Sequence, residues 1–274
     1  MAIEKGIRLG TVTLTDLKKS GGLEAAMRGF TRFYLGPEFC ENLLDDSVCA
    51  QAAWLQSRGK KICLLTPLLS EKGVKLLDSI FKKLLKLSLR GEIDPAELEI
   101  TANDFGAIVL AKRNRLPFKL NAGRLLRNNI FDDSVNGIKV HNGLALEFFH
   151  RFDITRFELS TVGIFPTVNF DRGRFYGFNR RTFKITLYYP YLDLTSTRTC
   201  LIGMRDIPPE ESARGVNCAR ECRIGTFELT HPYIKEKLLV RGNTIFLEFP
   251  NKFYPLEKDL SKMNVDRLVY APFL

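Results

Sequence analysis

The sequence predicts an α/β fold, a variant of the TIM-type (β/α) barrel that forms a single domain over residues 1–274. Three observations lead to this prediction. Short β-rich runs alternate with helical runs through the first 125 residues, which is the rhythm of βαβ units and of a mostly parallel sheet. Further β-rich runs continue almost to the last residue. A length of 274 residues is ordinary for one closed barrel.

The predicted elements follow one another in strand–helix order. In the front half the β-rich and helical runs are, in turn, Arg8–Leu14 and Leu17–Arg28, Arg32–Leu35 and Ser47–Arg58, Ile62–Pro67 and Glu71–Leu89, and Leu98–Thr101 and Phe105–Arg113. Later strands are expected at Phe118–Leu120, Arg156–Leu159, within the β-rich stretch Phe183–Leu194, and at Leu238–Val240, Ile245–Phe249 and Arg267–Tyr270. Together these runs supply enough parallel strands to close a barrel, whose functional residues are expected in the loops after the strand C-termini.

The composition, with 45% hydrophobic and 26% charged residues, is that of a globular protein with a packed core. No apolar run approaches the roughly 18 residues that span a bilayer, and Met1–Gly10 lacks the apolar region of a signal peptide. We therefore expect a cytoplasmic protein without a transmembrane segment. In a reducing compartment, six cysteines favour metal binding or catalysis over disulfides.

Lys and Arg outnumber Asp and Glu by 41 to 31, and a net charge of +10 attracts nucleic acid or anionic surfaces. The basic residues are scattered, so solubility is the simpler explanation. The segment Phe170–Lys184 interleaves aromatic and basic residues as nucleic-acid sites do; we favour a surface excursion with its aromatic side chains packed inward. The helix Glu71–Leu89 could suit a membrane surface, but an outer barrel helix has the same pattern and is preferred.

Four cysteines fall in loops that follow predicted strands. Cys40 follows Arg32–Leu35, Cys200 follows the stretch Phe183–Leu194, and Cys218 and Cys222 form a CxxxC pair. Four thiolates are the ligand number of a 4Fe-4S cluster and also of an all-cysteine zinc site. The arginines beside them would favour the thiolate form; these are Arg198, Arg214, Arg220 and Arg223.

The other two cysteines have apolar surroundings. Cys49 lies within a predicted helix and Cys63 within a predicted strand, where a thiol acts as a small hydrophobic group. The histidines His141, His150 and His231 show no zinc-hydrolase spacing, and the chain has no GxSxG motif, so a hydrolase has no motif to support it.

Several segments resemble peptidase family U32 and arrive in the order of that family. Arg156–Ser160 is similar to its RxELS strand, Ser196–Cys200 to its serine, arginine and cysteine segment, and Arg214–Arg223 to its RGxCxxxCR-like loop. The front half resembles the UbiV-like branch in particular: Tyr34–Cys40 is similar to YLGxxxC, Gly59–Thr66 to GKxIxLxT, and Asn103–Gly106 with Leu116–Phe118 to the middle barrel segment.

This resemblance spans nearly the whole chain and implies a barrel with a 4Fe-4S cluster on Cys40, Cys200, Cys218 and Cys222, in loops around 40 and 200–222. It implies a redox or hydroxylase subunit in oxygen-independent hydroxylation of an aromatic ubiquinone precursor. The expected partner in a hetero-oligomer is a related, UbiU-like U32 protein, which the end of the chain just after its last strand also favours. An RNA-hydroxylating U32 member and a U32-type peptidase are the alternatives.

No catalytic residue is assigned from the sequence. Glu158, at the end of a predicted strand, and the polar pair Asn103 and Asp104 are candidates for orienting a substrate. Glu158 suits an internal structural hydrogen bond equally well.

Overall fold

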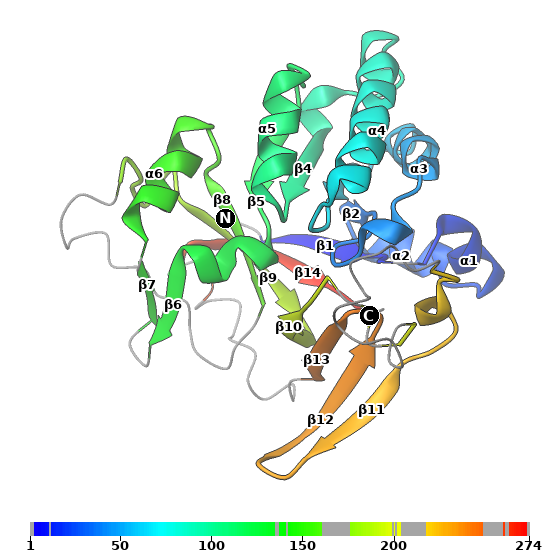
Figure 1. Ribbon diagram of the computed structural model, residues 1–274. Helices are drawn as coiled ribbons and strands as arrows, with labels where there is room; N and C mark the ends of the chain where they lie inside the picture. Colours follow the sequence, from blue (N-terminus) through cyan, green and yellow to red (C-terminus); the bar gives the residue numbers. More distant parts are fainter. Residues whose placement is uncertain are drawn as a thin grey trace.

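We describe a computed structural model of the protein, which covers residues 3–10, 12–134, 137–140, 142–160, 176–198, 200, 202–203, 218–248, 260 and 263–272. Eight strands close into a barrel, and every neighbouring pair is parallel, which confirms the predicted TIM-type α/β barrel (Figure 1). Around the barrel the strands are β1 (Glu4–Arg8), β14 (Val265–Tyr270), β9 (Lys184–Tyr189), β8 (Arg156–Ser160), β5 (Lys119–Ala122), β4 (Leu98–Ala102), β3 (Lys61–Leu65) and β2 (Arg32–Leu35).

Helices connect the strands of the barrel. They are α1 (Leu14–Lys19), α2 (Leu23–Gly29), α3 (Ser47–Gln56), α4 (Glu71–Leu89), α5 (Phe105–Arg113) and α6 (Gly143–Arg151), with short 3₁₀ turns η1 (Glu41–Leu43), η2 (Pro95–Glu97), η3 (Arg124–Asn129) and η4 (Glu221–Arg223). Helix α4 buries Leu77, Phe81 and Leu84 in the core, as expected of an outer barrel helix. Within the described residues, no helix has both the length and the apolar character needed to cross a membrane.

A four-stranded antiparallel sheet stands beside the barrel, and its hairpin β11–β12 projects away from it (Figure 1). Its strands, in spatial order, are β10 (Tyr191–Ser196), β13 (Thr244–Glu248), β12 (Ile234–Arg241) and β11 (Phe227–His231). A separate hairpin consists of β6 (Phe131–Ser134) and β7 (Gly137–Val140). A small apolar cluster of Phe39, Leu239 and Phe246 joins the four-stranded sheet to the loop after β2.

Two strands that were expected in the barrel belong to this second sheet. The predicted strands Leu238–Val240 and Ile245–Phe249 fall on β12 and β13, which pair antiparallel. The reason is the two-residue turn between Arg241 and Thr244, where Gly242 has a φ of +62°. Such a turn joins antiparallel neighbours, whereas parallel strands need a long crossover.

The stretch Phe183–Leu194 is also two strands. It divides at Pro190 into β9, which lies in the barrel, and β10, which lies in the second sheet. Proline has no N–H to donate to a ladder, so it interrupts a strand at this point.

The first predicted strand and helix were misplaced. Strand β1 ends at Arg8 rather than starting there, because Gly10 turns the chain with a φ of +61° and Thr13 caps α1 by accepting a hydrogen bond from the Asp16 N–H at 3.1 Å. The predicted helix Leu17–Arg28 is two helices, broken at Gly21, whose φ is +75°. The strands β6, β7 and β11 and the helix α6 were not predicted.

Buried ion pairs occupy one end of the barrel interior. Arg267 of β14 donates two hydrogen bonds to Glu99 of β4, at 2.7 and 3.0 Å, and a third to Glu4 of β1 at 2.6 Å. Arg32 of β2 binds the same Glu4 at 3.0 Å. Charges buried in this way are stable only when they are paired, so this network requires β14 to be in place between its neighbours.

Candidate functional site

Two of the four cysteines that the sequence singled out, Cys40 and Cys222, line the same pocket. Burial raises the pKa of the Cys40 thiol to about 11; a backbone hydrogen bond at Asn42 opposes this shift, and the charges of Cys218, Cys222 and Cys200 add to it. Burial, followed by the charges of Cys200 and Cys218, also raises the pKa of Cys222. The charges of the other three thiols therefore act on Cys40, although the four cysteines come from separate parts of the chain.

Cys40 lies in a loop after a barrel strand, as expected, whereas Cys200 follows a strand of the second sheet and not a barrel strand. Cys40 directly precedes η1 in the loop after β2, Cys200 follows β10, and Cys218 and Cys222 lie before and within η4. In the part of the chain that the structure describes, no three His, Cys, Asp or Glu side chains have the arrangement of a site for a metal ion.

Backbone N–H groups point at two of the sulfur atoms. The N–H of Gly203 donates to the Cys200 Sγ at 3.2 Å, and that of Arg220 donates to the Cys218 Sγ at 3.4 Å. Arg220 is in the left-handed conformation, with a φ of 63°, and its N–H contacts the sulfur of the cysteine two residues earlier. Hydrogen bonds to cluster sulfur atoms tune iron–sulfur clusters.

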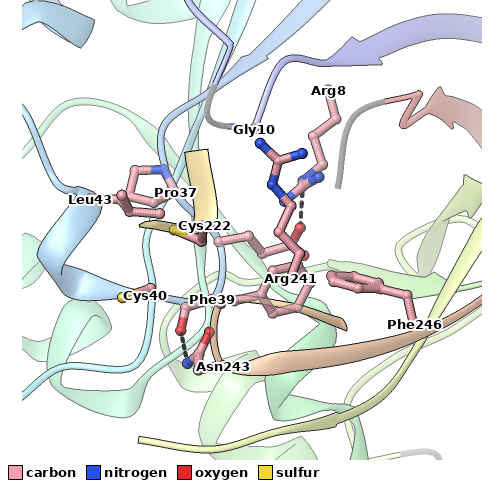
Figure 2. Close-up of a pocket in the computed structure, with 12 residues that line it drawn as sticks. Arg8, Gly10, Pro37, Phe39, Cys40, Leu43, Cys222, Arg241, Asn243 and Phe246 are labelled. Carbon is pink, nitrogen blue, oxygen red and sulfur yellow. Dashed lines mark hydrogen bonds and ion pairs between the residues drawn. The ribbon is translucent and has the colours of Figure 1, made fainter. Parts of the chain in front are cut away.

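Cys40 and Cys222 line an open pocket of about 380 Å³ together with Arg8, Phe39 and Arg241 (Figure 2). The charge of Arg241 lowers the pKa of Cys222, in opposition to burial and to the other thiols. Arg241 was not predicted. Of the arginines that were, Arg220 contributes its backbone N–H, and Arg214 lies outside the described residues.

The chemical types of these donors suit an iron–sulfur cluster. The donor set has four thiols, two of which already accept N–H hydrogen bonds, and a basic side chain whose charge favours the thiolate form. The residues that would hold the cluster are therefore Cys40, Cys200, Cys218 and Cys222.

A buried ion-pair array borders the cysteine pocket. Glu38, two residues before Cys40, binds Arg8 at 2.9 Å and receives two hydrogen bonds from Arg124 at 2.6 and 2.7 Å. Burial alone would raise the pKa of the Glu38 carboxyl, but the charges and hydrogen bonds of Arg124 and Arg8 outweigh burial and lower it. The Arg124 guanidinium also lies over the Tyr188 ring, 4.3 Å from its centroid.

Arg124 also lines a second pocket, of about 660 Å³, which lies at the ends of β5 and β8. There it donates to the Ser160 hydroxyl at 2.8 Å and binds Asp193 at 3.2 Å, while Ser160 donates to Asp193 at 2.6 Å. The C-terminal ends of the strands are where TIM-barrel active sites lie. The Glu38–Arg124 pair thus borders both pockets, with thiols on one side and a hydroxyl and a carboxylate on the other.

Sequence reasoning missed this array. Glu38 follows the predicted strand Arg32–Leu35, and Arg124 follows the predicted strand Phe118–Leu120. A polar residue shortly after a buried strand was the available signal, and it was used for the cysteines but not for these two residues.

Glu158 is buried in the middle of β8, not at a strand end as expected. It accepts hydrogen bonds from the Tyr188 hydroxyl at 2.6 Å and from Thr101 at 2.9 Å. Burial raises the pKa of its carboxyl to about 7, although both hydrogen bonds oppose the shift. Near neutral pH this group can therefore hold or release a proton inside the barrel.

Asn103 and Asp104 form hydrogen bonds that stabilise the turns near them. The Asn103 amide donates to the Thr66 carbonyl at 2.9 Å and accepts from the Leu125 N–H at 3.0 Å. Asp104 caps α5 by accepting from the Gly106 N–H at 2.6 Å. These contacts give both residues a structural role.

Replacing Glu158 with glutamine should flatten the dependence of stability on pH. The carboxyl has a reference pKa of 4.5 when unfolded and about 7 when folded, so between these values the folded state alone holds the proton. The contribution of the protonated carboxyl to the free energy of unfolding is complete below pH 4.5 and is lost as pH rises through 7. The loss is up to about 1.4 kcal/mol per pH unit and about 3 kcal/mol in total. The measurement is urea unfolding from pH 5 to pH 8.

Glu71→Gln is the control, since the Glu71 side chain is 86% exposed. Parallel curves for the parent and Glu158→Gln would contradict the pKa assignment. We also expect Glu158→Gln to keep the cysteine site and to lower activity; loss of metal from this variant would show a structural or ligand role.

Two further predictions concern the burial of side chains. Cys49 and Cys63 are fully buried, which confirms that they are core thiols. In the segment Phe170–Lys184, the side chains of Phe178 and Phe183 pack inward as expected, whereas that of Tyr176 is exposed. Residues 170–175 lie outside the described part.

No protein-family model and no curated protein matches the chain. Similar solved structures include a glycoside hydrolase family 18 N-acetylglucosaminidase from Paenibacillus barengoltzii, at 10% identity and a TM-score of 0.41, and a family GH18 chitinase from Cycas revoluta, at 11% and 0.44. A chitinase-like agglutinin from Robinia pseudoacacia has 10% identity and a TM-score of 0.40. In each case the match covers 98% of this chain and 94% of the other. Likeness at this level carries no argument about activity.

Proposed function

We propose that this protein is an iron–sulfur protein that binds a 4Fe-4S cluster through Cys40, Cys200, Cys218 and Cys222. The observation that carries the proposal is that Cys40 and Cys222 line one pocket and that the charges of Cys200 and Cys218 act on the pKa of both thiols. When bound, the cluster would supply one-electron transfer. The remaining chemistry would belong to the side chains of the barrel.

The proposed reaction is the one that the resemblance to the UbiV-like branch of family U32 implies, an oxygen-independent hydroxylation of a ubiquinone precursor. We propose that such a substrate would bind in the pocket at the ends of β5 and β8. Leu68, Leu125 and Leu192 offer apolar surface for an aromatic ring, and Ser160 and Asp193 offer a hydroxyl and a carboxylate for its polar substituents. Arg124 links this pocket to Glu38 in the wall of the cysteine pocket.

The test is purification without oxygen, followed by a visible spectrum and by iron, sulfide and zinc analysis. A brown protein with iron and sulfide in the amounts of one 4Fe-4S cluster per chain is expected. A colourless protein that contains zinc would overturn the redox function, because zinc is d¹⁰ and absorbs no visible light.

We further propose that the protein acts in a hetero-oligomer with a related, UbiU-like barrel protein. The sheet of β10–β13 supports this, because its edge strand β11 is exposed along its whole length and carries the apolar side chains of Phe227 and Leu229. Sizing of the holo-protein with and without such a protein should show a complex. A stable monomer under both conditions would contradict the proposal.

A further inference from the structure

Asn243 lies between two of the cysteine loops. It is the second residue of the tight turn between β12 and β13, and its side chain is buried. The Nδ2 group donates to the Phe39 carbonyl at 2.8 Å and to the Thr197 carbonyl at 2.5 Å. The Thr197 N–H in turn donates to the Asn243 carbonyl at 3.0 Å.

These partners place Asn243 beside the proposed ligands. Phe39 immediately precedes Cys40, and Thr197 lies in the segment that leads to Cys200. One side-chain amide therefore ties together two loops that come from the barrel and from the second sheet.

The same turn also touches a third ligand. Gly242, the residue before Asn243, has a φ of +62°, which favours glycine. A Cβ atom at this position would lie 3.4 Å from the Cβ and 3.8 Å from the Sγ of Cys222. The turn of Gly242 and Asn243 is thus in contact with the segments of Cys40, Cys200 and Cys222.

We propose that Asn243 is a positioning residue, which holds the loops of Cys40 and Cys200 together against Cys222 so that the thiols converge before any metal arrives. This inference deepens the proposed function and rests on it for the identity of the cluster. It does not depend on the cluster for the geometry, because all of these contacts form within the protein chain.

Asn264 offers a matched control. Its side chain is also nearly buried, and its Nδ2 group also donates to two main-chain carbonyls, those of Arg180 at 2.8 Å and Phe183 at 3.0 Å. It directly precedes β14, at the end of the barrel opposite to the loops that carry the thiols. Asn243→Asp and Asn264→Asp therefore each replace a twofold donor by an acceptor of the same shape.

The test measures metal binding and thermal stability in the parent and both variants. The first probe is Cd²⁺ added to the protein freed of metal, followed by the ultraviolet absorbance of cadmium–thiolate bonds. The second is the lifetime in air of the cluster reconstituted with iron and sulfide. Asn243→Asp should weaken Cd²⁺ binding and shorten the cluster lifetime by about tenfold, the lower range for residues that orient metal ligands. Asn264→Asp should change neither Cd²⁺ binding nor the cluster lifetime. It should lower the melting temperature by about as much as Asn243→Asp does.

Equal effects of the two variants on metal binding would overturn the inference and leave Asn243 with a general structural role. If Asn243→Asp does not fold, Asn243→Ser replaces it, since a hydroxyl donates one of the two hydrogen bonds, and an intermediate loss of Cd²⁺ affinity is then expected. A parent protein that takes up no cluster would contradict the proposed function, whereas the Cd²⁺ comparison would still decide the role of Asn243.

Discussion

Replacing Cys218 with serine should abolish the visible absorbance of the protein and most of its bound iron and sulfide. A serine hydroxyl is a harder and far less acidic donor than a thiol, so it does not replace a thiolate on iron. The same loss is expected for serine at Cys40, Cys200 and Cys222, because each supplies one of the four proposed ligands. The measurement is iron, sulfide and visible absorbance for single variants prepared without oxygen.

Cys49→Ala and Cys63→Ala are the controls. Both thiols are fully buried, and their hydrogen-bonding neighbours are protein groups: the Ile80 carbonyl for Cys49, at 3.8 Å, and the Thr101 hydroxyl for Cys63, at 3.0 Å. These variants should lose some stability and no iron. A full cluster in Cys40→Ser, or a lost cluster in Cys63→Ala, would show that the ligand assignment is wrong.

Replacing Arg124 with methionine should cost about 3 to 5 kcal/mol of unfolding free energy, because it leaves the buried Glu38 carboxylate without its bidentate partner. Methionine keeps much of the volume, so the loss reports the charge and hydrogen bonds rather than a cavity. For a chain of this size the melting temperature should fall by roughly 10 °C. The measurement is circular dichroism of the metal-free protein at neutral pH.

The matched control is Lys75→Met, which breaks an exposed ion pair with Glu71 on α4. Exposed pairs of this kind contribute little, so its melting temperature should stay close to that of the parent. Arg124→Lys keeps the charge but loses the two-pronged geometry and should fall between the parent and Arg124→Met. An equal effect of Lys75→Met and Arg124→Met would contradict the importance of the buried array.

The sequence predicted best those elements whose ends carry a local signal. Helices α4 and α5 have the predicted bounds because Ser70 and Asp104 cap their first turns. Strand β2 also has the predicted bounds, and Cys40 lies in the loop after this barrel strand as expected.

Features that depend on distant residues were not predictable. The runs that form β12 and β13 are short and apolar, so they resemble barrel strands until the turn at Gly242 is taken into account. The Glu38–Arg124 pair joins residues 86 positions apart, and one sequence contains no signal for such a pairing. The contacts of Asn243 with Phe39 and Thr197 are of the same kind.

The place of β14 in the barrel has a consequence for synthesis of the protein on the ribosome. This strand is the last of the eight in the chain, yet it lies between β1 and β9, and its Arg267 neutralises Glu99 and Glu4. At roughly 5 to 20 residues per second, the nascent chain has unpaired strand edges for tens of seconds after β1 emerges. The barrel therefore closes only after translation has reached β14, and until then the edges of β1 and β9 are open to mispairing with other chains.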